Sequence, residues 1–191
     1  MLKDLVKGAR SYRRFYGDKP VSKEQLIKLI DLARLSPSGA NKQPLKYIVI
    51  NDNSTNALVF DNIFWAGYLK DWAGPDIEER PTAYIVMLRD KDISKVPSMD
   101  EGICAQSIFL GAREAGLGGC FIGSFKKEEL MKGLHIEEKY EIALVIALGF
   151  VKEEVVIEEL NETGDVKYWR DDEQVHHVPK RSLEDIIIPR F

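Results

Sequence analysis

Cysteine is scarce in this sequence, and its scarcity excludes two classes of protein. The 191 residues include two cysteines, Cys104 and Cys120. Two cysteines cannot form the disulfide framework of a small secreted domain, and their spacing matches no zinc signature. We therefore expect no metal site and a location in the reducing cytoplasm, with both thiols packed in the interior rather than reactive.

Long apolar runs and an excess of positive charge are also missing. The longest uninterrupted apolar stretch, 142–148, has seven residues, whereas a membrane-spanning helix needs roughly 20. Acidic residues number 31 and basic residues 27, which gives a formal net charge of −4. Because this balance does not favour bulk electrostatic attraction to polyanions, we expect neither nucleic acid nor a membrane as partner.

The apolar content is sufficient for one core. Hydrophobic residues make up 45% of the chain, and a chain of this length buries roughly 70% of the surface that its unfolded form exposes. No repeat or linker divides the sequence, so we expect a single domain over residues 1–191. Residues from about 162 to 191 show no period long enough to fold alone, and we expect this tail to pack on a partner subunit.

Hydrophobic periodicity predicts both helices and strands. A capping box, Ser22 with Gln25, opens the clearest helix. A second helix carries small and apolar residues nearly all round, which predicts a central position, and Gly116 is its expected C-terminal cap. Two strands are almost entirely apolar, so we expect burial of both their faces. The predicted helices are 23–35, 100–115 and 126–132, and the predicted strands are 47–50, 83–88, 118–123 and 142–148.

The first candidate site is a basic cluster near the amino terminus. Six basic and two acidic residues lie within residues 1–19. Arg10, Ser11, Arg13 and Arg14 bring guanidinium groups and a hydroxyl together, a combination that suits a phosphate monoester. The same charges are also compatible with an ordinary solvated helix surface.

The second candidate site is the turn-rich stretch 36–44. Ser38, Gly39 and Asn41 offer a hydroxyl, bare backbone and a carboxamide on a loop held by Pro37 and Pro44. Such groups suit a planar heterocycle with alternating hydrogen-bond donors and acceptors.

Side chains for acid–base or nucleophilic catalysis are not evident. The glycine cluster at 116–119 follows a predicted helix and precedes a strand, the reverse of the order in a dinucleotide-binding loop. His135, His176 and His177 lack the spacing of a metal-binding pair, and adjacent residues of a strand point to opposite faces. We therefore predict no catalytic side chain.

Six short motifs follow one another along almost the whole chain. They are Arg10-Ser11-Tyr12-Arg13-Arg14-Phe15, the stretch 33–44, Asp100-x-Gly102 with Gln106, the stretch 116–125, Ala147-Leu148-Gly149-Phe150, and the stretch 179–186. In order and spacing this set resembles the nitroreductase family of FMN flavoproteins.

The resemblance implies an α+β fold, with a central mixed sheet surrounded by helices, and an intertwined homodimer that binds two FMN molecules at its interface. It assigns FMN to three sets of residues. Arg10, Ser11 and Arg13, with Lys180 and Arg181 from the tail, would hold the phosphate end; Pro37, Ser38, Gly39 and Asn41 would reach the ring from the other subunit; Ile122 and Gly123 would lie beside the ring, with the Gly123 amide near flavin N5.

The activity implied by the resemblance is an oxidoreductase reaction. Hydride from NADH or NADPH would pass through flavin N5 to a small-molecule acceptor such as a nitroaromatic or a quinone, by a ping-pong mechanism. The alternatives are an FMN store or sensor without turnover, and a specialised branch for flavin fragmentation or reductive dehalogenation. One departure from the family pattern is Ala9, where many members have a second basic residue. Either one phosphate contact is missing here, or Arg14 or Lys180 supplies it. The stretch 61–80 is where we expect substrate selection to vary.

Overall fold

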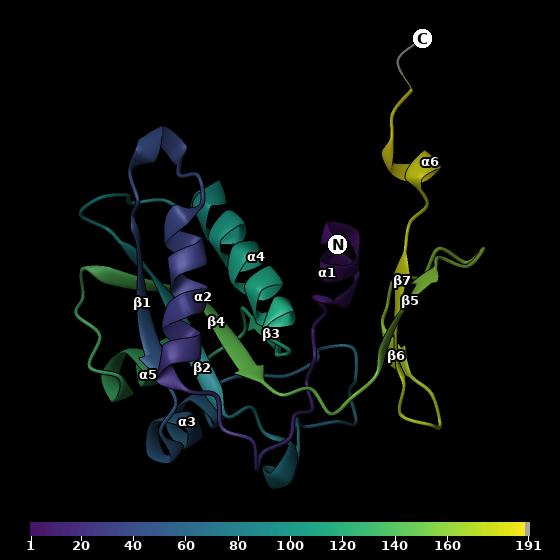
Figure 1. Cartoon of the computed structure of the whole chain (residues 1–191), viewed down its shortest axis with the longest axis horizontal. Coiled ribbons are helices and arrows are strands. Elements are labelled where there is room, and N and C mark those ends of the chain that lie inside the picture. The colour runs from purple at the N-terminus through teal and green to yellow at the C-terminus, as the bar shows by residue number, and fades with distance from the viewer. Residues whose placement is uncertain (190–191) are drawn as a thin grey trace. The chain divides into compact units, whose positions relative to one another are not determined.

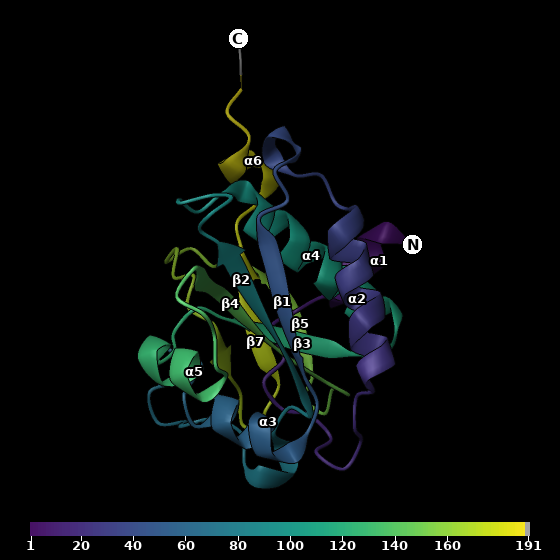
Figure 2. The same ribbon diagram turned by 90° about the vertical axis from the view of Figure 1, so that its left-hand side faces the viewer.

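The computed structural model describes residues 1–189, which form two compact units (Figures 1 and 2). Residues 1–65 and 73–152 make the first unit. The second combines residues 66–72 with residues 153–189. Helices and β-sheets both contribute, and the predicted α+β class is confirmed. No helix in the described range is long and apolar enough to cross a membrane.

A four-stranded sheet forms the centre of the first unit. Its order is β1-β2-β4-β3, and every neighbouring pair is antiparallel. All eight residues of β2 are buried, which confirms the prediction for the apolar residues 83–88 and extends burial to Arg89 and Asp90. In the register of β2 with β4, Ile85 lies opposite Ile146. The strands are β1 Leu45–Ile50, β2 Ala83–Asp90, β3 Gly118–Ile122 and β4 Tyr140–Gly149.

Helices cover both faces of this sheet. On one face Leu26 and Leu29 of α2 pack with Ile108 of α4. On the other face Val59 of α3 and Leu130 of α5 complete a second core, so the sheet separates two apolar layers. The helices are α1 Leu2–Gly8, α2 Lys23–Leu35, α3 Asn53–Phe60, α4 Met99–Glu114 and α5 Lys127–Gly133, with short 3-10 turns η1 Gly39–Asn41 and η2 Ile77–Glu79.

The ends of α2 and α4 follow from their sequences. Ser22 and Gln25 form the predicted capping box at the start of α2, because each side chain accepts a hydrogen bond from the other residue's backbone N–H. After α4, Gly116 adopts a φ of 74°. The amide of Leu117 then donates to the carbonyl of Ala112 (2.8 Å), the closing hydrogen bond of a Schellman motif.

The second unit contains a mixed three-stranded sheet. Its order is β5-β7-β6, with β5 and β7 parallel and β6 and β7 antiparallel. A buried ion pair joins Arg170 to Glu153 (2.8 Å), and Tyr68 packs on Tyr168 with ring centroids 4.9 Å apart. The elements are β5 Val155–Glu159, β6 Trp169–Arg170, β7 His176–Lys180 and α6 Leu183–Ile186.

His177 in β7 is held between two carboxylates. Its Nδ1 lies 2.5 Å from Glu158 Oε1, and its Nε2 lies 3.0 Å from Asp171 Oδ2. The indole of Trp169 stacks on the imidazole, with ring centroids 4.0 Å apart and planes 5° from parallel. The hydrogen bond to Asp171, together with Glu158 on the other nitrogen, raises the pKa of His177 above its ordinary value.

We refer to His177 between Glu158 and Asp171 as the clamp. We predict that it makes the free energy of unfolding depend on pH. Because the pKa of His177 is raised in the folded state, its cation stabilises the fold fully below the ordinary pKa of 6.5. This stabilisation is lost as the pH rises through the folded-state pKa. The thermal unfolding midpoint of the wild type should therefore fall from about pH 6 upward, and His177→Asn should flatten this part of the profile.

His135→Asn is the matched control. His135 is exposed and has a φ of 52°, a conformation that asparagine tolerates. If unfolding followed by circular dichroism gave the same pH profile for His177→Asn as for the wild type, the clamp would not be the source of the pH dependence.

Candidate functional site

The chain after α1 runs against β3. Ser11 forms a parallel bridge with Gly119, and the Tyr12 amide donates to the Gly119 carbonyl (2.8 Å). Glycine is required for this close approach, because a Cβ on Gly118 would lie 2.5 Å from Cδ2 of Tyr12. The basic cluster is thus fixed to the edge of the sheet.

The arginines of this cluster differ in their surroundings. Arg10 donates from Nη2 to the Val6 carbonyl (2.8 Å), whereas its Nε is buried and has no hydrogen-bond partner among residues 1–189. Arg13 is 7% exposed and donates from Nη1 to the Ser11 carbonyl (3.2 Å). Arg14 forms an ion pair with Glu79 (3.3 Å). Arg14, one expected substitute for the basic residue missing at Ala9, is therefore engaged in a structural contact.

The other end of β3 opens onto free space. Ile122 is buried at the end of the strand, and a Cβ built on Gly123 would meet nothing within 4 Å. The adjoining loop is held in place because the Phe64 amide donates to the Ser124 carbonyl (2.9 Å). Gly123 lies four positions after Gly119 in extended chain, about 13 Å along the strand. The structure thus brings the basic cluster, Ile122 and Gly123 to one edge of the sheet.

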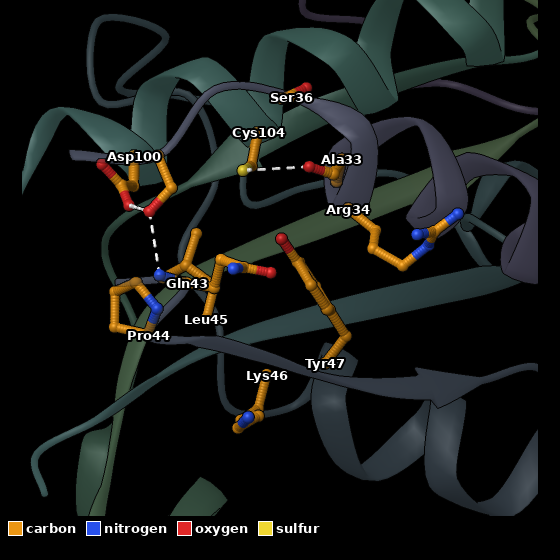
Figure 3. Close-up of a pocket in the computed structure, with 11 residues that line it drawn as sticks. Ala33, Arg34, Ser36, Gln43, Pro44, Leu45, Lys46, Tyr47, Asp100 and Cys104 are labelled. Atoms are coloured by element: carbon orange, nitrogen blue, oxygen red, sulfur yellow. Dashed lines mark hydrogen bonds between the residues drawn. The ribbon is translucent and has the colours of Figure 1, made fainter. Parts of the chain in front are cut away.

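The loop after α2 is held by a carboxylate of α4. Asp100 Oδ2 accepts from the Ser38 hydroxyl (2.5 Å), and its Oδ1 accepts from the Gly39 amide (2.9 Å). The Ser38 hydroxyl oxygen also accepts from the Gln43 amide (2.9 Å). Figure 3 shows Asp100 facing this loop and Gln43. Asp100 is 4% exposed, and the hydrogen bonds from Ser38 and Gly39 hold its pKa below the ordinary aspartate value.

Two hollows adjoin this loop. An open groove of about 710 Å³ runs between the loop and the start of α4. A smaller cavity of about 230 Å³ lies on the side of β1, where the Tyr47 hydroxyl points toward Cys104 (Figure 3). Burial raises the pKa of the Tyr47 phenol and of the Cys104 thiol, so neither is activated for nucleophilic chemistry. The groove is lined by Pro37, Ser38, Gly39, Pro97, Ser98, Met99, Asp100 and Ile103.

The remaining predicted residues belong to the second unit. Lys180 ends β7, and its carbonyl accepts from the Leu160 amide (2.9 Å). Arg181 follows, and both side chains are exposed. Within the part of the chain that the structure describes, no group of three or more His, Cys, Asp or Glu residues is arranged to hold a metal ion.

One residue that the sequence analysis did not place in the site is Asp100. In the sequence Asp100 stands out only as part of a motif with Gly102 and Gln106, because its partners Ser38 and Gly39 lie 62 and 61 positions away. A signal for this role was the position of Asp100 in the first turn of a helix that follows Ser98. At that position a carboxylate is favourable because of the helix dipole.

Comparisons with known proteins identify the family of this chain. The sequence model of the Nitroreductase family matches residues 6–150. A protein of Archaeoglobus fulgidus, provisionally named NADH dehydrogenase/NAD(P)H nitroreductase, is 30% identical over 149 residues, which cover 74% of this chain and 80% of that protein.

Solved structures show the same fold. The structure of an FMN-dependent nitroreductase from Clostridium difficile R20291 superimposes with a TM-score of 0.62 at 27% identity, covering 78% of this chain and 87% of that one. A nitroreductase family protein from Clostridium novyi NT gives 0.67 at 20% identity and covers 97% of this chain and 98% of that one. The family model spans most of the chain, including the basic cluster at 10–14 and the loop at 36–44. This protein is a member of the nitroreductase family.

Proposed function

We propose that this protein is an FMN-dependent oxidoreductase that uses NADH or NADPH to reduce a small-molecule acceptor. One observation carries the proposal: a guanidinium cluster lies on the same sheet edge as the open backbone at Gly123, in a chain of the nitroreductase family. The name of the Clostridium difficile relative, an FMN-dependent nitroreductase, supports the same cofactor here.

The residues present fit the phosphate end of FMN. Arg10 has a buried Nε without a partner among residues 1–189, and a dianionic phosphate is a suitable acceptor for that donor. Ser11 adds a hydroxyl and Arg13 a second guanidinium on the same stretch. We assign the phosphate and ribityl chain to these three residues, with Lys180 and Arg181 adding positive charge.

The residues also fit the ring end. Without a side chain at Gly123, a flat ring can approach the backbone, and the Gly123 amide is our candidate donor to flavin N5. Ile122 adds an apolar contact, and Pro37, Ser38, Gly39 and Asn41 of the other subunit would complete the pocket. The groove lined by Pro37, Ser38 and Gly39 is open in the single chain, which supports a site shared between subunits.

The absence of an evident catalytic acid, base or nucleophile is consistent with this activity. When bound, FMN would supply the redox chemistry, which is the transfer of hydride from NAD(P)H through N5 to a nitroaromatic, quinone or similar acceptor in ping-pong order. The protein orients the ring, excludes water and places amide dipoles and positive charge near the ring edge.

We expect the purified protein to be yellow, to release FMN on denaturation with about one FMN per chain, and to oxidise NAD(P)H rapidly when a quinone is added. Protein that stays colourless and gains no flavin absorbance on incubation with FMN would refute the proposal. Bound FMN without NAD(P)H turnover would instead identify an FMN store or sensor.

Arg10→Gln tests the phosphate site. We expect FMN affinity to fall by roughly 1.5–3 kcal/mol, the range for a hydrogen bond to a charged group. Lys28→Gln makes the same change in charge at an exposed pair with Glu24 (2.8 Å) and should leave the affinity unchanged. Equal FMN dissociation constants for Arg10→Gln and the wild type, measured by fluorescence titration, would remove Arg10 from the site.

Assembly as a homodimer is part of the proposal. The start of α4 exposes apolar residues, with Met99 84% and Ile103 39% exposed. The tail exposes Leu183, Ile186 and Ile188 to 70%, 60% and 87%. These apolar side chains support an intertwined interface of more than roughly 2,000 Å², as in obligate dimers.

Light scattering should therefore give twice the 21.7 kDa of one chain. Ile103→Glu should lower the dimer fraction and FMN binding together, because it places a charge in the interface. Ile27→Glu, the same change at an exposed position of α2, is the control. A monomer that still binds FMN tightly would contradict the shared site.

A further inference from the structure

The loop between α2 and β1 has an unusual backbone. Ala40, Asn41 and Gln43 have φ values of 50°, 52° and 50°. This left-handed region suits glycine and is tolerated by asparagine, but the Cβ of alanine or glutamine makes it costly. Two unfavourable residues within four positions persist only where surrounding contacts over-determine the conformation.

Asp100 supplies the contacts that hold the loop in this conformation. Both of its carboxylate oxygens are used, one by the Ser38 hydroxyl and one by the Gly39 amide, directly before the first left-handed residue. The Ser38 hydroxyl oxygen then accepts from the Gln43 amide, so one short chain of hydrogen bonds spans the loop from its start to its last left-handed residue. Asp100 itself is fixed in the first turn of the 16-residue helix α4.

These hydrogen bonds limit what the loop can offer to a ligand. The Ser38 hydroxyl proton and the Gly39 amide proton are both directed at Asp100. The side chain of Gln43 donates to Asn41 Oδ1 (3.1 Å), which orients that carboxamide. Asn41 Nδ2 has no hydrogen-bond partner within residues 1–189, so it remains as an available side-chain donor.

We propose that Asp100 is a positioning residue, which holds the loop 38–43 in its strained conformation and thereby presents the Asn41 carboxamide to the flavin ring. Ser38 then contributes through Asp100 rather than by donating to the ring. This inference rests on the proposed FMN site. It differs from a helix-capping role for Asp100, because it couples one residue of α4 to the affinity and the environment of a ligand bound by another element.

The first test is a double-mutant cycle on FMN affinity, measured by fluorescence titration of apoprotein. Asp100→Ala should weaken FMN about 10- to 100-fold, the range that corresponds to losing a hydrogen bond to a charged group. Asp100→Asn should have a smaller effect, because an asparagine oxygen still accepts from the Gly39 amide. Ser38→Ala combined with Asp100→Ala should bind no more weakly than Asp100→Ala alone, since both act through one contact. Additive losses would overturn the proposal.

The control is Asp52→Ala. Asp52 is also a capping carboxylate with two donors, the Thr55 amide (2.9 Å) and the Ser54 hydroxyl (2.7 Å), but it caps α3. This variant should lose stability without a change in FMN affinity. At saturating FMN, the visible circular dichroism of the bound flavin should change in Asp100→Asn and stay as in the wild type in Asp52→Ala. An unchanged flavin spectrum in Asp100→Asn would indicate a purely structural role.

Ala40→Gly tests whether the strained backbone itself contributes to FMN binding, because it relieves the strain and leaves the contacts of Asp100 in place. Glycine adopts a positive φ without steric cost, so the unfolding midpoint should rise. The loop also becomes freer, so FMN affinity should fall by about threefold or more, because preorganisation is lost. A variant that is more stable and binds FMN at least as tightly as the wild type would show that the strained conformation does not serve binding.

Hydrogen exchange measured on apoprotein tests the positioning role of Asp100 independently of FMN binding. In Asp100→Ala the amides of residues 38–43 should exchange faster than in the wild type, whether or not FMN binds. If the wild type takes up no FMN, the proposed function fails. If the wild type binds FMN but Asp100→Ala binds it equally well or leaves exchange unchanged, the positioning role fails.

Discussion

The fold depends on the burial of both faces of the β2–β4 strand pair. Residues of β2 alternate between the two cores: Ile85 packs in the layer under α2 and α4, and Val86 in the layer under α3 and α5. A one-residue slip of register would exchange the two sets of side chains. Helices α2, α3, α4 and α5 are therefore placed by the face of the sheet that each covers, and this fixes the loops that connect them to the strands.

Close backbone approach at β3 connects this core to the candidate site. Gly119 leaves no room for a side chain, because a Cβ there would lie 2.4 Å from the Ala147 carbonyl oxygen. Gly119 also forms the bridge with Ser11, and Gly118 lies against Tyr12. The basic cluster is thus attached to the closely packed edge strand of the central sheet. A ligand phosphate bound there would meet preorganised guanidinium groups rather than mobile side chains.

Sequence patterns predicted the parts of the structure that local chemistry determines. The helix 23–35 has the predicted bounds because its capping box and apolar period act within a few residues. The second sheet escaped prediction because β6 has two residues and β7 pairs with β5, so that His176 lies opposite Val155; such pairing leaves no local period. The family motifs located the candidate loop, but the bond from Ser38 to Asp100 spans 62 positions and is visible only in three dimensions.

The two proposed halves of the site differ in their backbone conformation and in whether their hydrogen-bond donors are already used. The arginine stretch is held to β3 by a single bridge between Ser11 and Gly119 and leaves a donor on Arg10 uncommitted. The loop at 38–43 uses an irregular backbone and commits its donors to Asp100. A phosphate needs charge more than exact direction, whereas a heterocycle needs donors placed at defined angles. In the proposed site, strain is therefore found at the loop assigned to the ring, where orientation decides recognition, and not at the stretch assigned to the phosphate, where charge does.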